Sequence, residues 1–163
     1  MNLAEFNELP DESARELLLS CCSAPRWASE VAAGRPYATV AQLGVAAEDA
    51  LTDSDVVDGL TGHPRIGERS SDPRSSREQS KVSEAGEDVL SALAEGNRAY
   101  EERFGHVYLV CASGRGAEEL LAVLRDRLDN DPATEWRVVR AELAAINRLR
   151  LARVLGEQTA VTG

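Results

Sequence analysis

The sequence predicts an all-α fold: a single-domain helical bundle with one buried extended segment. Apolar residues recur at spacings of three and four along most of the chain, as they do on one face of a helix. Aromatic residues make up only 4% of the chain, so Leu, Val and Ala must fill the core. Residues 106–112, HVYLVCA, are the only strand-like stretch, and one strand cannot form a sheet alone. We therefore expect them as a buried connector.

The N-terminal third shows several helix start and stop signals. Pro10 with the acidic residues after it is typical of a first helical turn. A second helix is expected from Ser23, as its N-cap, to Gly34, where it ends. Shorter helices are expected at 39–44, 46–53 and 52–60.

The C-terminal half predicts longer helices. Residues 75–105 form one long helix or two, because Gly86 and Gly96 weaken the case for a continuous one. Two amphipathic helices follow, separated by a break and a new N-cap at 130–132, Asn-Asp-Pro. We expect one domain over residues 1–156 and a tail at 157–163.

Composition excludes several classes of function. The net charge is −10 and no basic patch stands out, so nucleic acid is not an expected partner. No apolar run is long enough to span a membrane, and the first residues lack the pattern of a signal peptide. We expect a cytoplasmic protein. Three cysteines and two histidines, unclustered, predict no metal site and reduced, packed thiols.

The stretch that helices do not fill is 60–75, LTGHPRIGERSSDPRS, and it contains His63. A loop of this length in a compact domain is usually functional or disordered. Pro64 favours an extended backbone at His63, which presents an imidazole suited to proton transfer near neutral pH. A histidine exposed on a surface loop is the alternative.

Ser75, Glu78, Gln79 and Val82 share one helix face, at spacings of three, four and seven. The apolar Val82 suggests that this face turns inward, where polar side chains need partners. A capping box between Ser75 and Glu78 is the alternative explanation. The two are compatible, because a cap leaves Gln79 beside the loop that carries His63.

The last helix distinguishes two arginines. Trp136, Val139, Leu143 and Ile146 define an apolar stripe along it. Arg150 falls near the centre of this stripe, whereas Arg148 falls on nearly the opposite side. A core-facing arginine needs an anion or a set of acceptors. Arg150 is therefore either a structural residue or one that grips an anionic substrate.

Together these motifs resemble a known family. GHPRIGE, then S-x-x-EQ, NRAYEERFGHVYLVCASGRGAEELLAVLRDRLDND and ELAAINRLRL are similar to the 2-oxo-4-hydroxy-4-carboxy-5-ureidoimidazoline (OHCU) decarboxylases. The resemblance runs from about Leu3 to Gly156. It implies an all-helical fold, a homodimer, and a reaction without metal or organic cofactor that yields (S)-allantoin and CO2 in urate breakdown.

The resemblance also assigns site residues. His63 corresponds to the family's proton-transferring histidine, with Glu78 as a second catalytic group. Residues expected to contact the substrate are Pro64, Ser75, Glu78, Gln79, Arg150 and the segment Tyr108, Leu109, Val110, Cys111 and Ala112.

The chemistry agrees with this set. The conjugated ring of the anionic ureidoimidazoline can accept the electron pair left by decarboxylation, so no cofactor is needed. The enzyme then has to orient the carboxylate, stabilise developing charge and deliver a proton to one face. The alternative is a related helical protein that acts on, or merely binds, another ureide or hydroxy acid.

Overall fold

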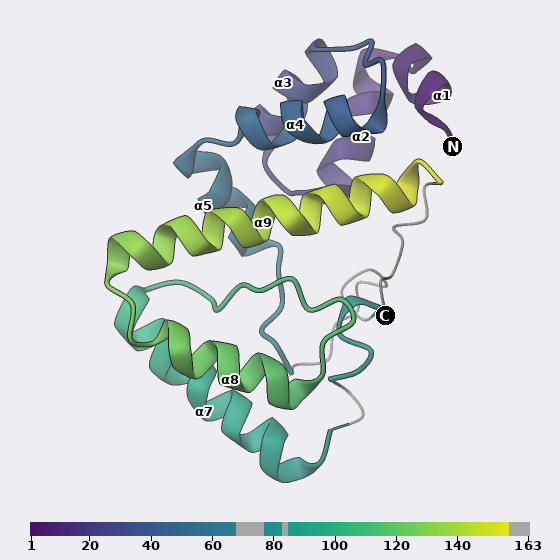
Figure 1. Ribbon diagram of the computed structural model, residues 1–163. Coiled ribbons are helices and arrows are strands. Elements are labelled where there is room, and N and C mark those ends of the chain that lie inside the picture. The colour runs from purple at the N-terminus through teal and green to yellow at the C-terminus, as the bar shows by residue number, and fades with distance from the viewer. Residues whose placement is uncertain (68–76, 83–84, 157–163) are drawn as a thin grey trace. The chain divides into compact units, whose positions relative to one another are not determined.

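The computed structural model describes residues 1–67, 77–82 and 85–156. The expected all-α class is confirmed: within these residues the regular secondary structure is helical and includes no strand (Figure 1). The helices are α1 (Leu3–Glu8), α2 (Asp11–Cys21), α3 (Pro25–Ala33), α4 (Val40–Ala50), α5 (Asp53–Thr61), α7 (Glu87–Phe104), α8 (Ala117–Arg127) and α9 (Pro132–Val154). None of the helices in this described part is both long and apolar enough to cross a membrane.

The chain forms two compact units. The first contains Met1–Gly62 and the chain from Leu143 onward, and the second contains His63–Glu142. Helix α9 contributes its first half to the second unit and its second half to the first. The expected domain boundary at residue 156 stays a prediction, and the expected tail lies outside the described residues.

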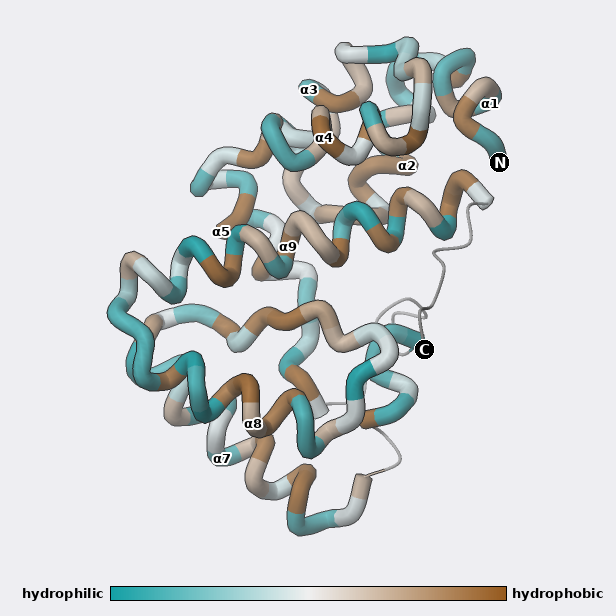
Figure 2. Tube along the Cα trace, viewed as in Figure 1, coloured by the Kyte–Doolittle hydropathy of each residue, from teal (hydrophilic) through white to brown (hydrophobic). Residues whose placement is uncertain are grey.

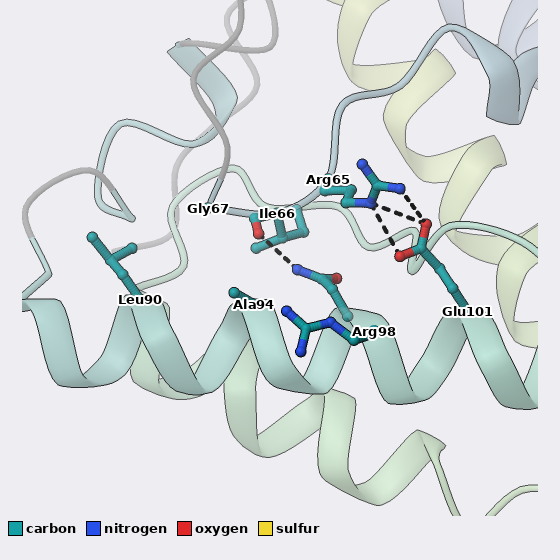
Figure 3. Close-up of a pocket in the computed structure, with 8 residues that line it drawn as sticks. Arg65, Ile66, Gly67, Leu90, Ala94, Arg98 and Glu101 are labelled. Atoms are coloured by element: carbon teal, nitrogen blue, oxygen red, sulfur yellow. Dashed lines mark hydrogen bonds and ion pairs between the residues drawn. The ribbon is translucent and has the colours of Figure 1, made fainter.

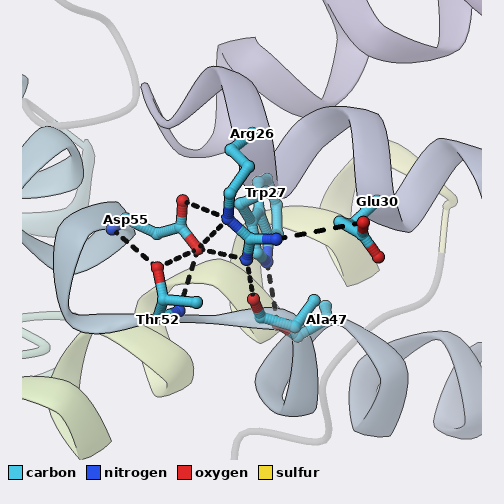
Figure 4. Close-up of polar contacts among 7 residues, drawn as sticks. Arg26, Trp27, Glu30, Ala47, Thr52 and Asp55 are labelled. Atoms are coloured by element: carbon cyan, nitrogen blue, oxygen red, sulfur yellow. Dashed lines mark hydrogen bonds and ion pairs between the residues drawn. The ribbon is translucent and has the colours of Figure 1, made fainter.

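A polar network joins helices α3 and α5 in the first unit. The Asp55 carboxylate accepts hydrogen bonds from the backbone and hydroxyl of Thr52, both 2.8 Å, and from Arg26 Nη2 at 2.6 Å (Figure 4). Burial alone would raise the pKa of Asp55, but these hydrogen bonds lower it below its ordinary value. The indole of the fully buried Trp27 donates to the Ala47 carbonyl at 2.7 Å, which attaches α3 to α4.

Two expectations for this unit were wrong. Ser23 is not an N-cap: α3 begins at Pro25 with Ala24 before it, and the Ser23 hydroxyl donates to the Asp58 carbonyl at 3.0 Å. Proline suits the first helical position, because its φ is already close to the helical value and its missing N–H would have no partner within the helix there. The two helices expected at 39–44 and 46–53 are one helix, α4, which runs through the buried Gly44.

The second unit packs α7 against α8 around a cluster that includes Leu93, Leu120 and Leu124. Hydrophobic positions alternate with hydrophilic ones along both helices (Figure 2). Gly96 lies inside α7, whereas Gly86 precedes it. The expectation of a helix running from residue 75 was wrong for residues 79–82, which form turns, so the helix face predicted to join Glu78 to Gln79 and Val82 does not extend past Glu78. A Cβ at Gly96 would lie 2.5 Å from Leu124 Cδ2, so the absent side chain makes room for α8.

The expected connector is confirmed as buried and non-helical. Tyr108, Leu109, Val110 and Ala112 are each less than 5% exposed, and Cys111 is half-buried. The expected break before the last helix is also confirmed, since the Asp131 carboxylate caps the Thr134 N–H at 2.9 Å.

Candidate active site

His63 lies in a non-helical stretch directly after α5. Helix α5 ends at Thr61, and Gly62 closes it by donating to the Gly59 carbonyl at 3.2 Å. His63 and Pro64 are both half-buried. This partial exposure suits a proton-transferring group, which has to reach a small molecule.

Residues 65–67, which follow His63 and Pro64 and which we call the turn, are held by three contacts. Arg65 forms a fork with Glu101, with Nε 3.0 Å from each carboxylate oxygen (Figure 3). The Ile66 carbonyl accepts from Asn97 Nδ2 at 2.9 Å, and the Gly67 N–H donates to Gln79 Oε1 at 3.0 Å.

A cavity of about 290 Å³ lies beside the turn. Its lining comes from the turn and from one side of α7, and consists of Arg65, Ile66, Gly67, Leu90, Ala94, Asn97, Arg98 and Glu101 (Figure 3). None of the described residues that were predicted to contact the substrate lines this cavity.

Glu78 and Gln79 differ in exposure and in their contacts. Glu78 is 7% exposed, and Gln79 is half-buried with its carbonyl oxygen on the Gly67 N–H. The expectation that Gln79 lies beside the His63 loop is therefore confirmed. Ser75, and with it the proposed capping box, lies outside the described residues.

The connector 108–112 is fixed by groups from α8 and α9. The Tyr108 hydroxyl donates to the Leu120 carbonyl at 2.9 Å, and the Leu109 carbonyl accepts from Arg127 Nη1 at 2.7 Å. The Cys111 N–H donates to Glu142 Oε2 at 3.0 Å. The Ala112 carbonyl also accepts from the Arg115 N–H at 3.0 Å, so three main-chain groups of the connector are already engaged by the protein.

Burial raises the pKa of the Cys111 thiol, and the carboxylates of Glu142 and Glu78 raise it further. The thiol therefore stays protonated at neutral pH and is a poor nucleophile. The Glu78 carboxylate thus acts electrostatically on a thiol of the connector.

A buried ion pair behind the connector was not predicted from the sequence. Arg127 is 5% exposed and Glu135 fully buried, with Nε 2.9 Å from Oε2. The Tyr100 hydroxyl also donates to Glu135, and the Arg127 guanidinium lies 4.9 Å from the Tyr108 ring centre. The two charges belong to different helices and lie on either side of the 130–132 break, so no helical spacing connects them.

Arg150 belongs to the first unit and is 5% exposed, whereas the Arg148 side chain is 60% exposed. The contrast that the apolar stripe predicted is therefore confirmed. Arg150 Nη1 donates to the Cys21 carbonyl at 3.0 Å. Arg148 pairs with Glu48 at 2.8 Å at the surface.

Polar groups surround Arg150. Burial raises the pKa of the Cys22 thiol to about 11, although the Asn147 amide and the Arg150 charge act in the opposite direction. Asn147 is 2% exposed, and neither atom of its amide has a regular hydrogen bond within the described residues.

The predicted site residues therefore fall into two groups. His63, Pro64, Glu78, Gln79 and 108–112 belong to the second unit, and Arg150 to the first. Within the second unit, the structure joins Gln79 to the turn and brings Glu78 near Cys111.

Comparisons with known proteins agree on one family. The family model described as OHCU decarboxylase matches residues 7–152. The uric acid degradation bifunctional protein TTL of Arabidopsis thaliana is 29% identical over 152 residues, which are 86% of this chain and 47% of the plant protein. The chain thus spans about half the length of that relative.

Two further proteins are similar over nearly their whole length. The 2-oxo-4-hydroxy-4-carboxy-5-ureidoimidazoline decarboxylase of Amia calva is 29% identical over 167 residues, covering 95% of both chains. A crystal structure of an OHCU decarboxylase, determined in the presence of (S)-allantoin, superposes with a TM-score of 0.78 at 28% identity. It covers 91% of this chain and 100% of the other. Because the family model covers most of the sequence and the fold agrees, this chain belongs to the OHCU decarboxylase family.

Proposed function

We propose that this chain converts 2-oxo-4-hydroxy-4-carboxy-5-ureidoimidazoline to (S)-allantoin and CO2, as a step of urate breakdown. The observation that carries the proposal is the family match over residues 7–152, which includes every residue assigned to the site. The fold shared with a decarboxylase crystallised with (S)-allantoin supports the same reaction.

In this proposal His63 transfers the proton. The bond between the ring carbon and the carboxylate breaks, CO2 leaves, and the electron pair enters the conjugated ring. A proton then replaces the carboxylate on one face and sets the configuration of the product. His63 suits this role because its side chain is half-buried and an imidazole can both accept and deliver a proton. Glu78, buried near the connector, orients the imidazole or accepts the ureido N–H groups.

The contacts of Gln79 restrict what it can do. Its Oε1 accepts the Gly67 N–H, and its Nε2 has no partner within the described residues. Gln79 would therefore act as a donor, toward a carbonyl or anionic oxygen of the substrate. Pro64 and, from the family resemblance, Ser75 are proposed as further substrate contacts.

The connector and Arg150 would bind the remaining polar groups. The Leu109 and Ala112 carbonyls and the Cys111 N–H are engaged, so substrate contacts along Tyr108, Leu109, Val110, Cys111 and Ala112 would use the other main-chain groups. The planar guanidinium of Arg150, which is 5% exposed, is suited to an anionic oxygen, since a fork of donors matches a carboxylate.

A direct assay tests the proposal. Fresh 5-hydroxyisourate with its hydrolase supplies the unstable substrate, and circular dichroism reports whether one enantiomer of allantoin accumulates. We expect (S)-allantoin to form faster with the protein than without it. Racemic product at the spontaneous rate would refute the proposed function.

We also propose a cytoplasmic homodimer. Membership of the family supports the dimer, and the acidic composition, with a net charge of −10, is typical of a cytosolic surface. Light scattering after size exclusion measures the assembly, and a mass equal to the 17.6 kDa monomer would rule the dimer out.

A further inference from the structure

The placement of the His63 imidazole depends on the turn that follows it. Pro64 has a fixed φ and restricts the backbone of His63. It does not restrict its own ψ or the residues after it. Any drift of residues 65–67 would therefore move the imidazole, which lies only two residues before Arg65.

Three consecutive residues of the turn are each held through a different group. The Arg65 side chain is held by Glu101, the Ile66 carbonyl by Asn97 and the Gly67 N–H by Gln79. Asn97 and Glu101 are four residues apart on α7, so both project from the same face of one rigid element. Gly67 has φ +92°, a left-handed conformation that suits glycine and ends the turn.

The contact from Asn97 is difficult to explain as a contribution to folding. Asn97 is 3% exposed and lies between Leu93 and Tyr100 on the buried side of α7. Its Oδ1 has no hydrogen-bond partner within the described residues, although Nδ2 donates to Ile66. Leaving a buried acceptor unsatisfied costs about 1–3 kcal/mol. An apolar residue would avoid that cost in this cluster, so Asn97 is better explained by the orientation that it gives Ile66.

We propose that Asn97 and Glu101 are positioning residues, which hold the turn so that His63 meets its substrate in a reactive geometry. This inference rests on the proposed function and adds two residues of α7 to it. The turn also contacts Gln79, because the Gly67 N–H donates to Gln79 Oε1. The turn therefore positions the proposed donor Gln79 together with the proposed acid His63.

Activity measurements test whether Asn97 and Glu101 affect the rate of the reaction. Glu101→Gln weakens the fork to Arg65, and Asn97→Ala removes the donor to Ile66. A misplacement of about 1 Å can cost about 100-fold in rate. We expect kcat to fall by about 10-fold to 100-fold in Asn97→Ala and by about threefold or more in Glu101→Gln, with KM within about twofold. Glu102→Gln makes the same change at an exposed neighbour on α7 and is expected to match the wild type.

The two histidines of the chain permit a second test that needs no activity. His106 lies in an aromatic cluster, 5.5 Å from the Tyr100 and Trp136 ring centres, and serves as an internal control. In proton NMR spectra of untagged protein, the His63 ring signals should shift in Asn97→Ala and in Glu101→Gln, but not in Glu102→Gln. Asn97→Ala changes no charge, so a shift there reports geometry. The His106 signals should stay in place.

The NMR and activity results together decide whether Asn97 and Glu101 position His63. His63 signals that coincide with the wild type in folded Asn97→Ala and Glu101→Gln would overturn the inference, as would unchanged kcat in both. If Asn97→Ala does not fold, Glu101→Gln against Glu102→Gln decides alone. A wild type without catalysis would overturn the proposed function instead, and the NMR comparison would still show whether α7 holds the turn.

Discussion

The buried ion pair between Arg127 and Glu135 gives a stability prediction. The Glu135 carboxylate is fully buried and accepts hydrogen bonds from Tyr100, Arg127 and Asn130. Glu135→Gln removes the negative charge and turns an N–H group toward these donors. Arg127, 5% exposed, would then be a buried cation without its counter-ion.

Breaking one partner of such a pair typically costs about 3–5 kcal/mol. For a chain of this size that loss corresponds to a fall in Tm of about 6–20 °C. Thermal and urea unfolding, followed by circular dichroism, measure the change. Glu102→Gln, at an exposed position of α7, should stay within about 2 °C of the wild type.

The double variant Arg127→Gln/Glu135→Gln separates charge from packing. It leaves neither charge unpaired, so it should be less destabilised than the sum of the two single variants. Arg127 also donates to the Leu109 carbonyl, so its displacement in Glu135→Gln should loosen the connector. A thiol reagent should then modify Cys111 faster than in the wild type at temperatures below the Tm. A Glu135→Gln protein that unfolds in the same range as Glu102→Gln would refute this account of the pair.

Three further predictions concern the proposed site. His63→Ala should lower turnover by about 10²–10⁴ and leave the circular dichroism spectrum unchanged; near-normal turnover would remove His63 from the mechanism. Arg150→Met should lower kcat/KM by about tenfold or more, as one charged hydrogen bond is worth about 1.5–3 kcal/mol, whereas Arg148→Met should not. Burial raises the pKa of Cys22 to about 11, above the value of about 8.5 for a thiol in the unfolded chain. The free energy of unfolding should therefore keep its full value below about pH 8.5 and fall as the pH rises from there toward 11. Cys22→Ala should flatten the decline between pH ~8.5 and ~10 in urea titrations.

Sequence periodicity predicted the helices whose signals are local. The break before α9 was found because Asp131 and Pro132 have the residue types that cap and start a helix. The failures involve tertiary contacts. Ser23 has the right residue type for a cap, but its hydroxyl binds the carbonyl of Asp58, thirty-five residues away. Gly44 was expected to separate two helices, yet it lies buried inside one.

The contrast between local signals and tertiary contacts also explains which site residues could be predicted from the sequence. Arg150 was selected because a charged residue in the middle of an apolar stripe needs a partner, and it is indeed buried. That rule also applies to α7, where Leu93, Asn97 and Tyr100 form the buried stripe and Asn97 is the polar exception. The sequence thus contained a signal for Asn97, the first residue of the quoted NRAYEERFG stretch, that the site assignment centred on His63 and Glu78 does not include.

A polar residue on a buried stripe has to be explained by what it contacts, and the contact decides whether it serves folding or function. The Arg127–Glu135 pair satisfies its members mutually and fixes the connector, so its loss should appear first as lower stability. Asn97 leaves one of its own atoms unsatisfied while it holds a single carbonyl beside the proposed acid. Its loss should therefore lower kcat more than its effect on unfolding would account for. If Asn97→Ala instead reduces activity only in proportion to the fraction of folded protein, as expected for Glu135→Gln, Asn97 does not position the site and simply stabilises the second unit.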